Sequence, residues 1–334
     1  GRMHYNKSDE AKEKGGYRMK RWICLFLMTA LLFAIPWAVR GEEEKLVFED
    51  AYDISYQRRC AQPGTVVKIH YPSQDYLGGT GEITKHALVY LPYGYNQESR
   101  YDVMVLCHGV GGTEGEWTFG QSYSFGKNIV DNLIANGEAR PMIIVMPNGR
   151  SCANYNDTSM ENAGAFYLFG QELRNDLLPY IDATYATYGG REHRAMAGLS
   201  MGGMQTINIG LCECLDLFSY FGAFSAAPTS YTSAEIAKRL EQFPDLPIRY
   251  FYSICGTEDS LYFAGSGAAK YITQYTDRLT EENWHWQERS GGHDFNIWNL
   301  GLYNFVRVFC GRGNIALISG LIGFDLCLLL RRLD

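Results

Sequence analysis

The stretch Ala195-Met196-Ala197-Gly198-Leu199-Ser200-Met201-Gly202 joins a short apolar segment to a helix-like one and contains a G-x-S-x-G motif. A serine on a sharp turn between a strand and a helix has a strained backbone, and flanking glycines let the neighbouring elements approach closely. The N-terminus of the following helix then favours negative charge close to the serine. We interpret Ser200 as a catalytic nucleophile. The alternative is a glycine-rich turn in which the serine only caps a helix.

Segments on both sides of this turn alternate between strand-like and helix-like patterns. Several strand candidates are nearly continuous apolar runs, which is typical of strands buried on both faces of a parallel sheet. The expected strands are Val66–Tyr71, Ala87–Leu91, Val103–Cys107, Met142–Met146, Ala195–Gly198, Tyr220–Ser225, Ile248–Ile254 and Trp284–Arg289. The expected helices are Asn128–Ala135, Glu172–Thr184, Met201–Leu211, Ala234–Phe243, Ala268–Glu282 and Ile297–Phe309. Together with the serine turn, this alternation predicts one α/β-hydrolase domain over residues 42–310. Its sheet should be mostly parallel with helices on both faces, and the first two strands should form an antiparallel pair at its edge.

A serine hydroxyl needs a general base, and in this architecture an acid and then a histidine follow the serine along the chain. His285 lies inside an expected strand, whereas His293 lies in the loop after that strand, at the sheet edge where sites of such folds form. We therefore assign the base to His293. Asp259 follows the preceding strand at the same edge and is assigned as the acid, with Glu258 as the alternative. Asp294 is expected to cap the next helix.

The negative charge that develops on the substrate oxygen needs backbone N–H donors. Met201, the residue after the nucleophile, should supply the first of them. The second is expected from the glycine-rich stretch Cys107-His108-Gly109-Val110-Gly111-Gly112, which follows an expected strand. We nominate Val110, with Gly111 as the alternative. His108 is expected to support this loop rather than to act as a base.

Several motifs resemble the feruloyl esterase domains attached to bacterial cellulosomal xylanases, in carbohydrate esterase family 1 of the esterase D group. The likeness extends from about Tyr90 to Phe309. It is carried by Leu91-Pro92-Tyr93-Gly94-Tyr95, His108-Gly109-Val110-Gly111-Gly112, Asn132-Leu133-Ile134-Ala135, Pro141-Met142-Ile143-Ile144-Val145-Met146-Pro147-Asn148, Arg191-Glu192-His193-Arg194-Ala195, Gly198-Leu199-Ser200-Met201-Gly202-Gly203, Cys255-Gly256-Thr257-Glu258-Asp259-Ser260 and Gly291-Gly292-His293-Asp294-Phe295. The resemblance implies a Ser200, Asp259 and His293 triad that releases ferulate from arabinoxylan.

The sequence indicates the substrate less directly than it indicates the catalytic residues. Only 22 residues, Ala226–Pro247, separate two expected strands, which leaves little or no room for a lid. Four aromatic residues near expected strand ends are candidates either for stacking on an aromatic acyl group or for ordinary packing: Trp117, Tyr155, Tyr262 and Trp298. Two alternatives stay open. One is an acetylxylan, siderophore or thioester hydrolase of the same fold, and the other is a non-catalytic carbohydrate-binding member.

Composition narrows the function classes further. The 334 residues are 46% hydrophobic and 20% charged, as expected for a folded globular chain. Residues 1–41 hold eight Lys or Arg and three Asp or Glu, a net charge of +5. Because the whole chain has a net charge of −7, residues 42–334 carry −12. An acidic body argues against a nucleic-acid partner. No metal-ligand spacing is present, and a dinucleotide-like match at residues 311–316 follows an expected helix rather than a strand. We therefore expect neither a metal nor a cofactor.

The two ends of the chain differ from its body. Lys20 and Arg21 precede the apolar run Trp22–Val39, a pattern typical of a secretory signal. We expect residues 1–41 to be an extension with a signal peptide that leads to secretion, or alternatively a membrane anchor. Residues 311–334 form an apolar tail that is short for a membrane span, and we interpret it as separate from the domain, with a second membrane anchor as the alternative.

Overall fold

The computed structural model describes residues 46–79, 81–118 and 124–311. The expected leader, and the C-terminal tail beyond Gly311, lie outside these ranges. Within the described ranges, no helix combines the length and the apolar character that crossing a bilayer requires.

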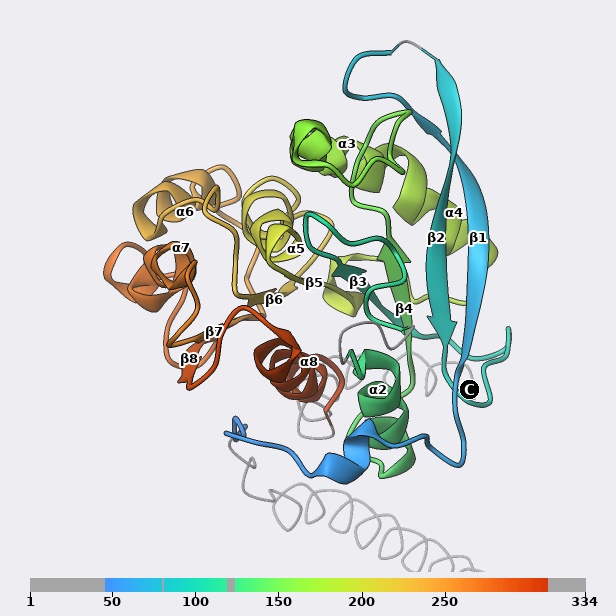
Figure 1. Cartoon of the computed structure of the whole chain (residues 1–334), viewed down its shortest axis with the longest axis horizontal. Coiled ribbons are helices and arrows are strands. Elements are labelled where there is room, and N and C mark those ends of the chain that lie inside the picture. The colour runs from blue at the N-terminus through green and yellow to red at the C-terminus, as the bar shows by residue number, and fades with distance from the viewer. Residues whose placement is uncertain (1–45, 80, 119–123, 312–334) are drawn as a thin grey trace, which may run out of the picture. The chain divides into compact units, whose positions relative to one another are not determined.

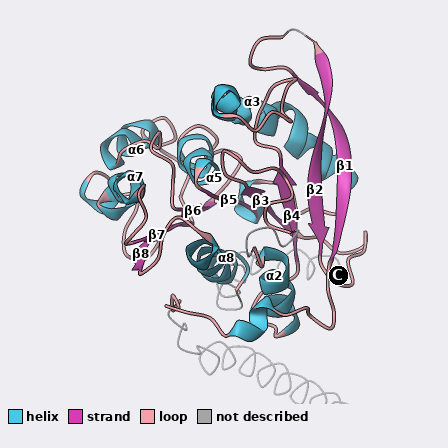
Figure 2. Ribbon diagram, in the orientation of Figure 1, coloured by secondary structure: helices cyan, strands magenta, loops and turns pink. Residues whose placement is uncertain are grey.

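Eight strands of the described chain form a single mixed sheet in the order β1-β2-β4-β3-β5-β6-β7-β8 (Figure 2). Their bounds are β1 Thr65–Gln74, β2 Glu82–Leu91, β3 Asp102–Cys107, β4 Met142–Pro147, β5 Arg194–Leu199, β6 Tyr220–Phe224, β7 Tyr250–Gly256 and β8 Trp284–Arg289. β2 pairs antiparallel with both β1 and β4, and every other pairing is parallel. All eight expected strands and the antiparallel edge pair are therefore confirmed.

Helices cover both faces of this sheet. Figure 1 shows α2 and α8 on one side of it and α3, α4, α5 and α6 on the other. The α-helices are α2 Gly126–Ala135, α3 Phe169–Glu172, α4 Leu178–Thr184, α5 Met201–Gln205, α6 Ser233–Leu240, α7 Tyr262–Gly265 and α8 Phe295–Cys310. Shorter 3-10 or π-helical segments are Ile54–Gln57, Met160–Leu168, Leu173–Leu177, Arg191–His193, Thr206–Leu211, Ser266–Lys270 and Ile272–Gln274. The α/β-hydrolase prediction is confirmed by this layered arrangement.

Side-chain caps explain where two of the helices begin. Thr232 and Glu235 form a reciprocal capping box at the start of α6, in which each side chain accepts the backbone N–H of the other residue. Asp294 accepts a hydrogen bond of 2.8 Å from the Asn296 N–H at the start of α8, as expected from the sequence. α6 buries Ile236 in the main hydrophobic core, so the segment between β6 and β7 belongs to the helical layer instead of forming a lid.

The expected helix Ala268–Glu282 is wrong over its second half. Helical structure ends with the 3-10 turn Ile272–Gln274, and a loop leads to β8. Side chains hold that loop: the Arg278 guanidinium donates to two backbone carbonyls at and beyond the end of α6. Asn283 Nδ2 donates to the Ile248 carbonyl at 3.0 Å. These long-range contacts compete successfully with the local helical pattern.

Candidate active site

The turn between β5 and α5 has the geometry that the G-x-S-x-G motif predicts. Ser200 has φ 51° and ψ −114°, a strained conformation for a residue with a side chain. A Cβ on Gly198 would lie 2.7 Å from the Gly202 backbone, and one on Gly202 would lie 2.6 Å from the Cys107 carbonyl oxygen. Only glycine therefore fits at positions 198 and 202. The turn raises Ser200 at the carboxyl end of β5, next to the end of β3.

His293 and Asp259 are paired directly. His293 Nδ1 lies 2.9 Å from Asp259 Oδ2, and the Asp259 side chain is fully buried. The other carboxylate oxygen accepts the Leu261 N–H at 2.7 Å, and the Cys255 thiol contacts Oδ2 at 3.7 Å. A neutral imidazole that donates through Nδ1 keeps Nε2 as its proton acceptor. This is the tautomer that a general base needs.

The neighbouring carboxylate has different partners. Glu258 accepts hydrogen bonds from the Gly291 N–H, Thr257 Oγ1 and Ser290 Oγ. These hydrogen bonds, led by that from Gly291, lower the pKa of the exposed Glu258 carboxyl. The geometry thus joins His293 to Asp259, while Glu258 braces the backbone of the loop that carries the histidine.

The loop after β3 lies beside Ser200. A Cβ placed on Gly109 would be 3.5 Å from Ser200 Cβ. In the described part of the chain, the N–H groups of Met201, Val110 and Gly111 donate to no other group. These three predicted donors therefore have no competing acceptor within the described residues.

His108 has a structural environment, as expected. Its Nδ1 donates to the Gly109 carbonyl at 2.7 Å, and its Nε2 accepts the Gly149 N–H at 3.2 Å. Burial lowers the pKa of His108 to about 3. A neutral imidazole with both nitrogens engaged holds the loop and has no free site for proton transfer.

Two charged residues near the site were not anticipated from the sequence. Glu116 Oε2 accepts the Gly109 N–H at 2.8 Å. Burial raises the pKa of the Glu116 carboxyl, while the Gly109 hydrogen bond and the charges of Arg150 and His293 oppose that shift. Arg150 is fully buried just after β4. The available signal was the position of Arg150 beyond the carboxyl end of an expected strand, where ligand sites of such sheets lie.

Two of the four aromatic candidates are buried. Trp117 is 1% exposed, its Nε1 donates to the Cys107 carbonyl, and its ring packs edge-on against Phe295. The indole therefore packs in the core, which is the second of the two roles considered from the sequence. Trp298 is also largely buried, with its ring edge-on to His293 at a centroid distance of 5.0 Å. That contact supports the imidazole ring of the paired histidine.

The two tyrosine candidates are half-buried, and their hydroxyl groups are hydrogen-bonded to protein. Tyr155 donates to the Thr84 carbonyl at 3.2 Å, near the start of β2. Tyr262, at the start of α7, bonds to Glu288 and accepts from Lys270 Nζ at 3.1 Å. Both lie at elements bordering the carboxyl edge of the sheet, and their roles stay predictions.

Comparison with known proteins agrees with this geometry. A family model described as "Putative esterase" matches residues 82–307. The chain belongs to this esterase family. The esterase is 33% identical over 215 residues to an endo-1,4-beta-xylanase/feruloyl esterase from Xylanibacter ruminicola, covering 62% of this chain and 27% of that protein. It is 36% identical over 179 residues to endo-1,4-beta-xylanase Y from Acetivibrio thermocellus, covering 50% of this chain and 15% of that protein. The esterase thus spans only a minor part of the length of these curated relatives.

A solved structure supports the same conclusion. The carbohydrate esterase family 1 ferulic acid esterase from Anaeromyces mucronatus, in complex with ferulic acid, has 26% identity and a TM-score of 0.64. The match covers 79% of this esterase and 97% of that chain. The predicted resemblance to feruloyl esterases is confirmed by these comparisons.

Proposed function

We propose that this esterase cleaves hydroxycinnamate esters, above all feruloyl esters of plant cell wall arabinoxylan, through an acyl-enzyme. The observation that carries the proposal is the 2.9 Å contact between His293 Nδ1 and Asp259 Oδ2 at the sheet edge that also bears the strained Ser200. The relatives add the substrate class, because their names include feruloyl esterase and xylanase activities. The apolar run Trp22–Val39, outside the described residues, supports secretion as the route to a polysaccharide substrate.

The proposed reaction has two halves. In the first, Ser200 Oγ attacks the ester carbonyl carbon while His293 Nε2 accepts the hydroxyl proton. The N–H groups of Met201 and of Val110 or Gly111 stabilise the resulting oxyanion. The bond between the carbonyl carbon and the sugar oxygen then breaks, and the leaving oxygen takes the proton from His293 to become a hydroxyl. The feruloyl group stays esterified to Ser200. In the second half, His293 activates a water that releases ferulate and regenerates the serine.

The substrate test compares two natural esters in parallel. The protein is incubated with feruloylated arabinoxylan and with acetylated xylan, and the released acids are separated and measured. Ferulate release is the expected result. Acetate release without ferulate would reject the proposed acyl group and favour the acetylxylan esterase alternative, while the serine mechanism would remain.

The nucleophile test uses Ser200→Ala. We expect kcat to fall by roughly 10⁶-fold because members of a serine triad act as a unit. Circular dichroism and thermal unfolding check that the variant is folded. Hydrolysis of methyl ferulate by the folded, purified variant near the wild-type rate would exclude Ser200 as the nucleophile. A wild-type protein that hydrolyses no ester would instead favour the non-catalytic carbohydrate-binding role.

A further inference from the structure

Arg150 holds the loop that carries the candidate oxyanion donors. Its guanidinium donates through Nη2 to the Val110 carbonyl and through Nη1 to the Gly112 carbonyl, the latter at 3.1 Å. The side chain is fully buried, and the guanidinium carbon lies 4.8 Å from the centre of the Phe166 ring. The guanidinium is planar and its donors have a fixed geometry, so a buried arginine restrains the orientation of its acceptors more than a flexible lysine ammonium would.

The bound carbonyls determine where the free N–H groups point. In a trans peptide, the carbonyl of one residue and the N–H of the next point in opposite directions. Because Arg150 binds the Val110 carbonyl, the Gly111 N–H points away from the guanidinium. The preceding peptide is fixed in the same way, since the Gly109 carbonyl accepts from His108 Nδ1 at 2.7 Å and from the Gly112 N–H at 3.1 Å. The Val110 N–H therefore points away from His108.

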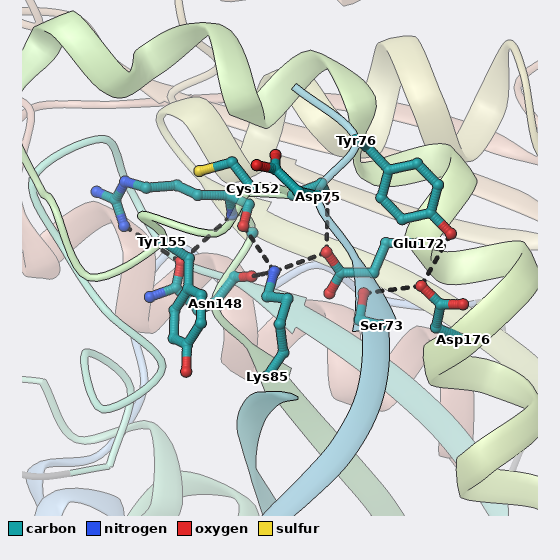
Figure 3. Close-up of polar contacts among 12 residues, drawn as sticks. Ser73, Asp75, Tyr76, Lys85, Asn148, Cys152, Tyr155, Glu172 and Asp176 are labelled. Carbon is teal, nitrogen blue, oxygen red and sulfur yellow. Dashed lines mark hydrogen bonds and ion pairs between the residues drawn. The ribbon is translucent and has the colours of Figure 1, made fainter. Parts of the chain in front are cut away.

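A buried ion pair in turn fixes the backbone of Arg150. Lys85 Nζ donates to the Arg150 carbonyl at 2.6 Å, to the Asn148 carbonyl at 2.9 Å and to Glu172 Oε2 at 2.6 Å. Figure 3 shows Lys85 between Asn148 and Glu172, where β2 meets the end of β4 and α3. Both charged side chains are 0% exposed. Such a pair is weak evidence for stability because desolvation offsets the attraction, and a role in fixing one geometry suits it better.

We propose that Arg150 is a positioning residue that aims the Val110 and Gly111 N–H groups at the oxyanion formed on the substrate. The inference rests on the proposed function and deepens it. Arg150 does not touch the reacting atoms in this scheme and acts through the peptide planes that it holds. Loss of the guanidinium should therefore weaken binding of the transition state far more than binding of the ester or the acid product.

A matched control exists elsewhere in the chain. Arg191 also holds backbone carbonyls through its guanidinium, those of Leu215, Phe218 and Pro247. It lies just before β5, at the edge of the sheet opposite to Ser200. Replacing it removes a comparable structural clamp without affecting the loop after β3.

The experiment uses the full chain with Arg150→Met, Arg150→Lys and Arg191→Met. We measure kcat and KM for 4-nitrophenyl acetate and methyl ferulate, inhibition by ferulic acid, and thermal unfolding. Arg150→Met should lower kcat by about 100-fold, within the range of about 10²–10³ that loss of one oxyanion donor costs. KM and ferulic acid inhibition should change little, Arg150→Lys should be intermediate, and Arg191→Met should lose stability but keep its kcat.

Several outcomes would overturn the inference. Folded Arg150→Met with wild-type kcat would do so, and so would an equal fall of kcat in Arg150→Met and Arg191→Met. If Arg150→Met does not fold, Arg150→Lys decides, because lysine has one nitrogen on a shorter reach where two guanidinium nitrogens now hold the two carbonyls. Wild-type kcat in that variant would reject the role. A wild-type protein that hydrolyses neither ester would instead reject the proposed function.

Discussion

Asp259 and Glu258 are adjacent in sequence, yet only one of them contacts an imidazole. Asp259 holds His293 Nδ1, whereas Glu258 accepts the Gly291 N–H. We expect Asp259→Asn to lower kcat by about 10⁴-fold, since an amide leaves the base in the wrong tautomer. The matched variant Glu258→Gln, which keeps an acceptor oxygen for Gly291, should retain most of the activity. Steady-state kinetics on methyl ferulate distinguish the two, and a larger loss in Glu258→Gln would transfer the acid role to that residue.

The buried His108 makes the fold sensitive to acid. Burial lowers its pKa to about 3, while a histidine in the unfolded chain titrates near 6.5. Between these values the unfolded state binds more protons, so the free energy of unfolding falls as the pH falls. This one group contributes a slope of up to about 1.4 kcal/mol per pH unit. We expect His108→Asn to lose that slope in urea unfolding between about pH 6 and about pH 4. An unchanged slope would contradict the assignment.

Single residues differ in how far the sequence reveals them. Ser200, Asp259 and His293 could be placed because motif, chain order and strand ends all restrict them. The sequence could not decide between packing and ligand contact for Trp117, since an aromatic at a strand end has the same pattern whether it faces a ligand or the core. Arg150 was not singled out because the two loop groups that it holds are backbone carbonyls, and no sequence pattern records such contacts.

The β5 turn and α5 depend on a close approach to β3. A Cβ on Gly202 would meet the backbone and Cβ of Cys107 at 2.6–2.8 Å, so β3 and α5 would have to separate. We expect Gly202→Ala to cost about 1–3 kcal/mol, typical of overpacking, and to lower kcat by displacing Ser200. Gly267→Ala is the control, because nothing lies within 4 Å of its added Cβ. Chemical denaturation and esterase assays of both variants test this, and equal stabilities would contradict it.

Elements with a strong internal pattern were predicted well from the sequence. β3, β4 and β5 are buried along their whole length, and their continuous apolar runs are unambiguous in the sequence. The 3-10 segment Met160–Leu168 was missed because it lacks helical periodicity. It nevertheless buries Phe166 in a cluster against which Val110, in the loop after β3, packs. The loop before β8 was missed for the opposite reason, since its local pattern is helical and distant side chains override it.

At the scale of the whole molecule, the proposed chemistry needs no inorganic partner. Within the described ranges, no three His, Cys, Asp or Glu side chains gather closely enough to bind a metal ion. We expect ferulate release to be unchanged after dialysis against EDTA, because His293 rather than a metal activates the water. Rates measured before and after chelation test this. A loss that Zn²⁺, Mg²⁺ or Ca²⁺ restores would count against the serine mechanism.

The end of α8 is tied to the beginning of β4. Gly311 forms a bridge with Ala139, and the Arg140 N–H donates to the Cys310 carbonyl at 2.8 Å. The six residues of β4 then run about 20 Å to the edge that carries the catalytic candidates. A tether, fluorophore or immobilising support attached at Gly311 would therefore lie at the edge of the sheet opposite to Ser200. An enzyme captured on a surface through that point would present Ser200 outward, toward an insoluble polymer.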